Sequence, residues 1–290
     1  MLNTVWLTER SNDGTAGCVM LLGGFDGLHA GHKKLVARAR SYGLPVGAMT
    51  IVGGKTGNSL FTTTERRVLF KNAGVDFLFE LPFAEIRTLS FVEFAKLLEE
   101  KFAPKAFVCG DDFRFGYMAQ GTPETLAGAT HVRVETVELL KINGEKIGST
   151  AIKESLTSGR IEKANALLGE EFFLIGKVYK DRQVGRTIGF PTANIRYPEH
   201  KFPLKKGVYE TRVTVDGQEY KGITNYGARP TFDNEDTLTE TYVDGFDGDL
   251  YGKTLRVRFV RYLRDIEKFD GAEELRAQLR EDIRRVREND

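Results

Sequence analysis

The ten residues GGFDGLHAGH at positions 23–32 stand between a short apolar run and a segment with helical periodicity. The run CVMLL at 18–22 predicts a buried strand, and a helix is expected from His32 to Tyr42, closed by Gly43. Glycines in the turn let the backbone approach a ligand closely, and the unpaired amides of a helix N-terminus favour phosphate oxygens. The stretch therefore predicts a strand, a turn and a helix, with a phosphate site at the turn.

Two of the four histidines of the chain, His29 and His32, lie in this turn. Spaced three residues apart at a helix start, both imidazoles can direct donors at a polyphosphate and stabilise charge that develops at an attacked phosphorus. A turn with two incidental surface histidines is the alternative. A zinc site is disfavoured, because no cysteine, histidine or carboxylate cluster of ligand spacing accompanies the pair.

The first half of the chain alternates predicted strands with predicted helices. Further strands are expected at 45–52, 75–81, 106–109 and 131–138. Two capping boxes mark helix starts, namely Thr62 with Glu65 and Ser90 with Glu93. Such alternation predicts a mainly parallel sheet that binds ligands at the carboxyl ends of its strands.

Beyond Gly169 the pattern changes to short strands separated by turns. Asp216 and Gly217 stand between two strand-like runs, which predicts a tight hairpin. Other strands are expected at 173–179, 238–243 and 254–262, and one charged helix at 271–287. This half is therefore expected to be a small antiparallel barrel with a terminal helix, and the chain to divide into domains 1–168 and 169–290.

Bulk properties agree with two ordinary globular domains. The 290 residues are 41% hydrophobic and 29% charged, and no apolar run approaches the roughly 20 residues that span a bilayer. The net charge of +1 gives no electrostatic reason to expect a nucleic-acid partner. The first residues lack a secretory pattern, so a cytoplasmic protein is expected, with Cys18 and Cys109 as buried free thiols.

Two more motifs in the first half offer polar groups after predicted strands. GDDFRFG at 110–116 places Asp111, Asp112 and Arg114 at a strand end, and an acidic turn with a packed aromatic pair is the alternative. IGSTAIK at 147–153 opens a helix, and plain capping of that helix would explain its serine and threonine equally well. At that helix start Ser149 and Thr150 could also donate to phosphates, with a cation at Lys153.

In the second half, GRTIGFPTANI at 185–195 combines a stiff proline with flanking glycines. Thr192 and Asn194 would then be held on a fixed backbone, where their neutral oxygens suit Mg²⁺, a cation that prefers octahedral oxygen coordination. The alternative is a turn in which both side chains satisfy local backbone groups.

The histidine turn resembles the signature of the nucleotidylyltransferase half of bacterial bifunctional riboflavin kinase and FAD synthetases. The motifs at 110–116 and 147–153 are also similar to that family. The resemblance implies an α/β nucleotidylyltransferase-type domain in which His29 and His32 act on phosphates. It also implies that nucleotide or flavin is bound by Gly24, Phe25, Asp26, Gly27, Gly31, Asp111, Asp112, Arg114, Ser149, Thr150 and Lys153.

The second half resembles flavokinases across nearly its whole length. The matching pieces include NYGARPTF at 225–232, ETY at 240–242 and DLYG at 249–252. The resemblance implies a riboflavin-kinase-like barrel in which Glu240 is the catalytic base, and Tyr242 stands where relatives often have histidine. The residues implied to bind nucleotide, flavin or metal are Gly185, Thr192, Asn194 and Arg229.

Together the two resemblances imply FAD biosynthesis from riboflavin, FMN and ATP with Mg²⁺, small molecules being the expected partners. Three departures from the family leave a kinase-only protein as an alternative. Gly148 replaces a serine, Lys153 replaces an arginine, and TIVGGKTGN at 50–58 replaces a Glu-Pro type segment. A non-catalytic flavin-binding regulator is a further alternative.

Overall fold

The computed structural model describes residues 3–6, 17–53, 58–139, 141–142, 145–180, 189–228 and 237–288. By contacts between residues the chain separates into two compact units, Met1–Ser149 and Thr150–Asp290. The predicted boundary between 168 and 169 remains a prediction, although the segment before it groups with the second unit. Within the described ranges, no helix is long and apolar enough to cross a membrane.

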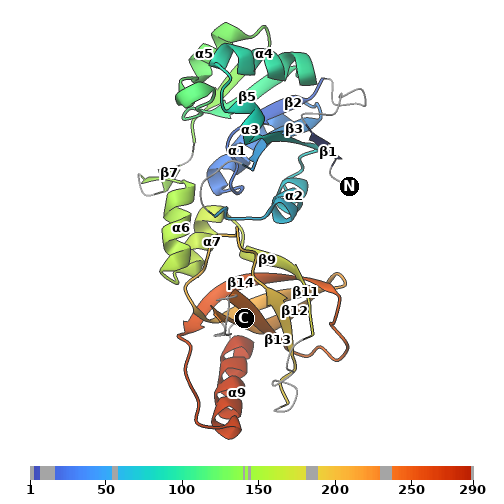
Figure 1. Ribbon diagram of the computed structural model, residues 1–290, viewed down its shortest axis with the longest axis vertical. Helices are drawn as coiled ribbons and strands as arrows, with labels where there is room; N and C mark the ends of the chain where they lie inside the picture. Colours follow the sequence, from blue (N-terminus) through green and yellow to red (C-terminus); the bar gives the residue numbers. More distant parts are fainter. Residues whose placement is uncertain are drawn as a thin grey trace. The chain divides into compact units, whose positions relative to one another are not determined.

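The first unit is built on a six-stranded sheet in the order β1-β4-β3-β2-β5-β6 (Figure 1). All its pairings are parallel. The strands are β1 (Asn3–Trp6), β2 (Val19–Leu22), β3 (Val46–Val52), β4 (Phe77–Pro82), β5 (Ala106–Gly110) and β6 (Arg133–Val137). The predicted parallel sheet is confirmed, and β1 is an edge strand that the sequence analysis missed.

The strand order reverses direction at β2, because β3 pairs on one of its sides and β5 on the other. In open parallel sheets the crevice at such a reversal, outside the carboxyl ends of the strands, is where ligands bind. The turn that follows β2 holds the histidine motif, and the turn after β5 begins with Asp111. The topology therefore brings two of the sequence motifs to one edge of the sheet.

Five helices of the first unit connect the described strands. They are α1 (Ala30–Arg40), α2 (Thr63–Asn72), α3 (Phe83–Ile86), α4 (Phe91–Phe102) and α5 (Pro123–Ala129). Both predicted capping boxes form, with Thr62 and Ser90 as N-caps. Helix α1 begins two residues earlier than predicted because His29 itself is the N-cap residue. A histidine of the motif is thus fixed by the start of the helix.

Both cysteines are buried free thiols, as predicted. Cys18 directly precedes β2 and Cys109 lies in β5, within the same apolar core. Burial raises the pKa of Cys18 to about 11 and that of Cys109 to about 12, because a thiolate would lose its hydration. Both residues therefore pack as small apolar groups rather than as reactive thiolates.

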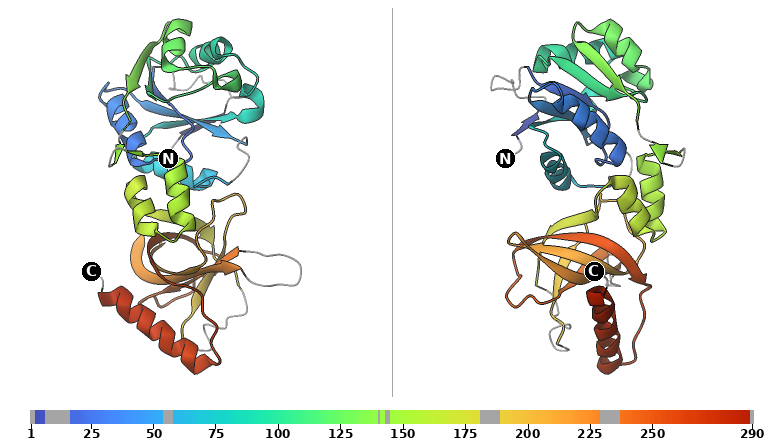
Figure 2. Two further views of the ribbon diagram at one scale, coloured as in Figure 1. Left: turned by 90° about the vertical axis from the view of Figure 1, so that its left-hand side faces the viewer. Right: turned by 180° about the vertical axis from the view of Figure 1, so that it is seen from behind.

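The second unit combines two helices with an antiparallel barrel and a terminal helix, as Figure 2 shows. Its helices are α6 (Ser149–Thr157, the first residue of which belongs to the first unit), α7 (Ile161–Leu168) and α9 (Ala272–Glu288). Its strands are β9 (Phe172–Lys177), β10 (Thr192–Arg196), β11 (Gly207–Val215), β12 (Gln218–Ala228), β13 (Thr237–Val243) and β14 (Thr254–Arg264). Ahead of it in the chain, the short strands β7 (Lys141–Ile142) and β8 (Glu145–Lys146) form a two-stranded ribbon.

These six strands pair in the order β10-β13-β12-β11-β14-β9, which confirms the predicted antiparallel architecture. The two end strands approach each other where Tyr179 forms an isolated antiparallel bridge to Asn194. The predicted hairpin between β11 and β12 turns at Asp216 and Gly217, with φ angles of 49° and 86°. Left-handed conformations at both positions are typical of a type I′ turn, which explains the Asp-Gly pair.

Inside the barrel three buried threonines are linked by their hydroxyls. The Oγ1 atom of Thr224 lies 2.9 Å from that of Thr211 and 2.9 Å from that of Thr241. All three side chains are fully buried. Hydrogen bonds from hydroxyl to hydroxyl across neighbouring strands offset the cost of removing these groups from water.

Helix α9 packs against the outer face of the sheet. Ile283 and Val286 form an apolar cluster with Val208 and Ile223. Beside this cluster, Arg264 of β14 donates from Nη2 to Oδ2 of Asp282 at 2.8 Å and from Nε to the same carboxylate. The Asp282 side chain is fully buried, so this ion pair anchors the helix to the strand.

Replacing Asp282 with alanine is expected to destabilise the protein by about 3–5 kcal/mol, because it leaves the Arg264 guanidinium without its buried counterion. Denaturant unfolding of the purified chain measures the loss. Glu273→Ala is a matched control, since Glu273 lies on the same helix with a side chain that is 87% exposed. A loss no larger than the roughly 1 kcal/mol typical of exposed ion pairs would contradict the assigned role.

Candidate functional site

The glycine-rich turn after β2 is shaped by a strained, buried phenylalanine. Phe25 has a φ of 34°, a left-handed conformation that costs energy for a residue with a side chain. Its ring is buried and packs edge-on against the ring of His32, with the centroids 4.8 Å apart. Phe25 therefore offers a ligand only its backbone, and its side chain supports a histidine.

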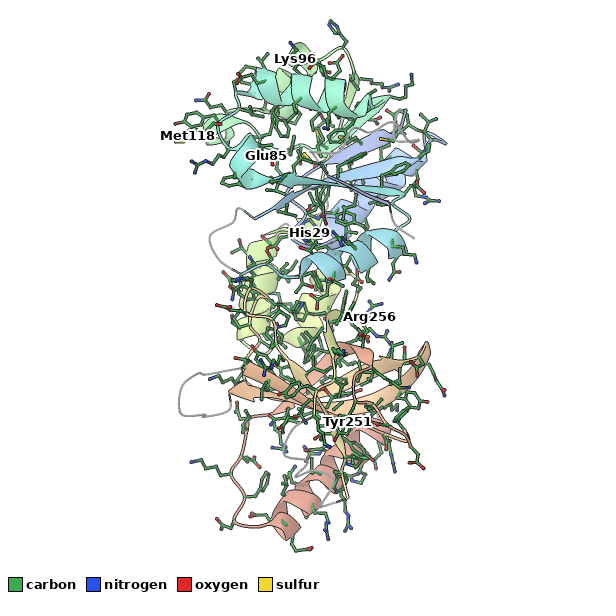
Figure 3. The ribbon with its side chains drawn as sticks, turned by 45° about the vertical axis from the view of Figure 1, so that its right-hand side comes forward. His29, Glu85, Lys96, Met118, Tyr251 and Arg256 are labelled. Atoms are coloured by element: carbon green, nitrogen blue, oxygen red, sulfur yellow. The ribbon has the colours of Figure 1, made fainter. Side chains whose placement is uncertain are left out.

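The two histidines lie stacked, with ring centroids 3.5 Å apart (Figure 3 marks His29). The Nδ1 atom of His32 lies 2.8 Å from the carbonyl oxygen of Gly27, which can only accept, so this nitrogen carries a proton. The Nδ1 atom of His29 accepts a bond from the backbone N–H of His32 at 3.4 Å. The neutral His29 ring therefore carries its proton on Nε2, and the two rings have opposite tautomers.

A network of buried charges lies beside this turn. Asp26 accepts a hydrogen bond from the backbone N–H of Leu60 at 2.9 Å, and its charge attracts the buried guanidinium of Arg66. Burial lowers the pKa of Arg66, while the nearby carboxylates of Asp26 and Glu80 oppose that shift. Arg66 donates to Oγ1 of Thr50 at 3.0 Å and to the Ile51 carbonyl at 3.3 Å. Asp26 therefore belongs to the network of hydrogen bonds and charges that holds the turn in place.

The carboxyl ends of β2, β3 and β5 border a cavity of about 470 Å³. Its lining is mostly apolar and consists of Gly23, Gly24, Met49, Ile51, Phe83, Ile86, Arg87, Phe94, Phe113, Arg114, Phe115, Gly116, Tyr117, Met118 and Ala119. Phe113 and Phe115 stack at 5.3 Å between centroids. At the rim, Met118 is 76% exposed and projects from the unit in Figure 3. A mostly apolar cavity of this size, with an arginine in its lining, is typical of a site for a small ligand.

Two of the residues predicted to bind nucleotide or flavin line this cavity. Gly24 and Arg114 line the cavity, whereas Asp111 and Asp112 are exposed in the turn after β5. A side chain added at Gly27 would press on the Phe61 ring, and one added at Gly31 would press on the His29 ring. Lys153 lies in the second unit with its ammonium 5.2 Å from the ring centre of Phe202. Ser149 and Thr150 form the first turn of α6, as predicted.

The second candidate site is a polar row on the outer face of the barrel. Asn194 of β10 pairs with Glu240 of β13, which pairs in turn with Asn225 of β12. In the next row Thr192 pairs with Tyr242. Directly paired residues on neighbouring strands share a face of a sheet, so these five side chains lie together. The predicted residues Thr192, Asn194 and Glu240 are thereby brought into one site.

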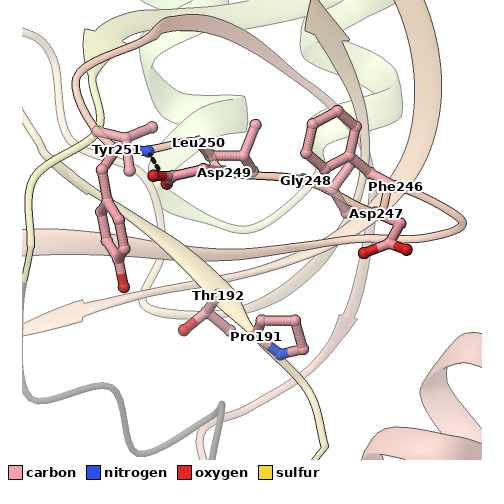
Figure 4. Close-up of a pocket in the computed structure, with 10 residues that line it drawn as sticks. Pro191, Thr192, Phe246, Asp247, Gly248, Asp249, Leu250 and Tyr251 are labelled. Atoms are coloured by element: carbon pink, nitrogen blue, oxygen red, sulfur yellow. Dashed lines mark hydrogen bonds between the residues drawn. The ribbon is translucent and has the colours of Figure 1, made fainter.

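A cavity of about 440 Å³ adjoins this row on the side of Thr192 (Figure 4). It is lined by Val178, Pro191, Thr192, Val243 and the loop from Phe246 to Tyr251. In Figure 4 Pro191 and Thr192 face this loop, whose Asp249 accepts a bond from the Tyr251 N–H at 2.9 Å. The cavity therefore opens beside a threonine hydroxyl and the acidic loop that contains Asp247 and Asp249.

Charge beside the row comes from Asp244, at the start of the same loop. Arg287 donates to both its oxygens at 2.7 Å and holds the pKa of Asp244 below its usual range. Burial raises the pKa of the neighbouring Tyr242, and the Asp244 charge adds to that shift. Tyr242 is therefore a neutral phenol and no candidate for the proton acceptor at neutral pH.

The polar row fits a magnesium ion held jointly with phosphate. The Oδ1 atom of Asn194 is buried and has no hydrogen-bond partner among the described residues. No group of three histidine, cysteine or carboxylate residues in the described ranges could hold a metal ion by itself. Mg²⁺ normally keeps waters and substrate phosphates and needs few protein ligands. Neutral oxygens from Thr192 and Asn194 suit that mode of binding.

Two predicted site residues, Gly185 and Arg229, lie outside the described residues. In turn, the structure adds residues that sequence analysis missed. In the sequence analysis Asn225 appears only within the motif NYGARPTF. Its alternation with the apolar Tyr226 along a strand was the signal that could have marked it as a residue of the polar face. Arg87, Phe94 and Met49 come from three separate elements, and no local pattern could join them in one cavity.

Nuclear magnetic resonance of ¹⁵N-labelled imidazoles tests the tautomers. At neutral pH we expect His29 to carry its proton on Nε2, with Nδ1 unprotonated. His32 should be protonated on Nδ1, because the carbonyl oxygen of Gly27 can only accept a hydrogen bond. The exposed His131 and His200 are internal references for the assignment of the imidazole signals. A bare Nδ1 in His32 would refute the assignment.

Comparison with known proteins matches both units. Residues 11–151 match the family model described as FAD synthetase, and residues 168–289 match that of riboflavin kinase. A solved structure from Streptococcus pneumoniae, titled a macrolide-efflux protein, is 30% identical with a TM-score of 0.87 and covers 99% of both chains. That title describes the pneumococcal protein, and the likeness is one of sequence and fold.

Three relatives are each named bifunctional riboflavin kinase/FMN adenylyltransferase. That of Haemophilus influenzae is 30% identical over 95% of both chains. That of Bacillus subtilis is 32% identical over 91% of this chain and 90% of the relative, and that of Escherichia coli K12 is 31% identical over 94% and 92%. With a histidine turn in one unit and a Thr192, Asn194 and Glu240 row in the other, the chain belongs to the bifunctional riboflavin kinase/FMN adenylyltransferase family.

Proposed function

We propose that the chain makes FAD in two steps, phosphorylating riboflavin in its second unit and adenylylating FMN in its first. Membership of the family and the presence of both of its domains support this proposal. The observation that carries it is that each unit has its own polar site beside its own cavity. The proposed compartment is the cytoplasm, with which two free thiols are compatible.

In the proposed kinase step, Glu240 accepts the proton of the terminal hydroxyl of riboflavin as its oxygen attacks the γ-phosphorus of ATP, and ADP leaves. Phosphoryl transfer needs mainly positioning and charge neutralisation. The cavity beside Thr192 would hold the nucleotide, and Thr192 with Asn194 would hold Mg²⁺. Bound there, the metal would neutralise phosphate charge.

In the proposed adenylylation step, a phosphate oxygen of FMN attacks the α-phosphorus of ATP, and pyrophosphate leaves. The Nε2–H group of His29 would donate to the phosphate oxygens that gain charge. The apolar cavity lined by Phe94, Phe113 and Phe115 would take the flat flavin ring, and Arg114 at its edge would attract phosphate. No covalent intermediate is required.

Glu240→Gln is expected to reduce FMN formation by about 10²–10⁴-fold, because the amide cannot accept the proton. FAD formation from supplied FMN should stay unchanged, since that site lies in the other unit. Chromatographic assay of both products measures the two rates. Glu219→Gln is the matched control, a half-exposed glutamate on β12 that should leave both rates intact. Loss of both activities in the Glu240 variant would contradict separate sites.

His29→Asn is expected to lower FAD formation from FMN by about 10²–10³-fold and to leave FMN formation unchanged. Asparagine keeps an N-cap acceptor for α1, so the helix start is preserved while the imidazole donor is lost. His131→Asn serves as the control at an exposed position. If wild-type chain with FMN, ATP and Mg²⁺ yields no FAD while riboflavin is phosphorylated, the kinase-only alternative holds.

A further inference from the structure

Asn225 occupies a position that the proposed mechanism does not yet use. On β12 it pairs with Glu240, which faces Asn194 on its other side. The proposed base thus lies between two asparagines on one face of the sheet. A carboxylate flanked by amides on both neighbouring strands can be approached by two different ligand groups.

The amide oxygens of both asparagines are buried, and neither has a hydrogen-bond partner in the part of the chain that the structure describes. Buried acceptors in native proteins are nearly always paired, so an exception requires an explanation. The proposed Mg²⁺ would account for the unpaired oxygen of Asn194, because Asn194 shares β10 with Thr192, which lines the cavity proposed for the nucleotide. The oxygen of Asn225 lies on the other side of Glu240, on β12, and this magnesium site does not account for it.

The surroundings of Asn225 narrow the choice of ligand. Its partner on β11 is Val208, which belongs to the apolar cluster under α9 and offers no polar group. The amide of Asn225 can accept with its oxygen and donate with its nitrogen. A chain of hydroxyl groups does both as well, whereas a phosphate only accepts near neutral pH. The chemistry of this position therefore matches a polyol.

We propose that Asn225 binds the hydroxylated chain of the phosphoryl acceptor and thereby aligns its reacting hydroxyl with Glu240. The inference rests on the proposed kinase function and adds a residue that selects the acceptor. Nucleotide would approach Glu240 from the β10 side and the alcohol from the β12 side. The two substrates then meet at the carboxylate.

The test compares Asn225→Ala with wild type in the full chain. We expect the KM for riboflavin to rise about tenfold, the loss of affinity that removing one hydrogen bond causes. The KM for ATP should stay within about twofold of the wild-type value. Gln218→Ala, at an exposed position on the same strand, is the matched control. Equal changes in both KM values, or a change confined to ATP, would overturn the proposal.

A binding measurement separates this inference from the proposed function. Without ATP, quenching of flavin fluorescence gives the Kd of riboflavin and of lumiflavin, which carries a methyl group in place of the hydroxylated chain. Asn225→Ala should weaken riboflavin about tenfold and leave lumiflavin unchanged. If both flavins weaken equally, or neither does, the proposal is wrong. Absence of FMN formation by wild type would instead refute the kinase function, and FAD formation from FMN reports that the variant is folded.

Discussion

Strand register is the constraint on which both candidate sites depend. A shift by one residue would turn every side chain of a strand to the other face. In the barrel, the pairing of Asn194 with Glu240 and of Glu240 with Asn225 puts three separate segments in one row. In the parallel sheet, β2 is held between β3 and β5, so the turns that follow β2 and β5 meet at one edge. The chemistry of each unit is thus fixed by backbone hydrogen bonds rather than by the polar residues themselves.

Both sites also contain groups that a stable fold alone would avoid. Phe25 is held in a left-handed conformation, and the amide oxygens of Asn194 and Asn225 are buried without partners among the described residues. A buried polar group left unpaired costs about 1–3 kcal/mol. Backbone strain and unpaired acceptors in such turns and strands are typical of sites prepared for ligands.

Local signals in the sequence predicted much of this arrangement. The turn at Asp216 and Gly217 is set by the backbone conformations that these two residues allow. The capping boxes at Thr62 and Ser90 depend only on the unpaired amides of a helix start. Both could therefore be predicted without knowledge of the rest of the fold. Strand β10 was missed because its proline and glycine neighbours indicate a turn, and only pairing with β13 makes it extended. The cavity lined by Phe94 and Met49 depends on distant elements, which no periodicity in one segment can join.

The three threonines inside the barrel constrain how the chain can evolve. Valine has nearly the shape of threonine, so a single replacement fits the space, yet losing the hydroxyl of Thr224 would deprive Thr211 and Thr241 of a shared partner. Replacing all three at once would leave no hydroxyl to satisfy. Descendants of this sequence are therefore expected to keep the trio or to exchange it as a set, so these positions should covary among homologues.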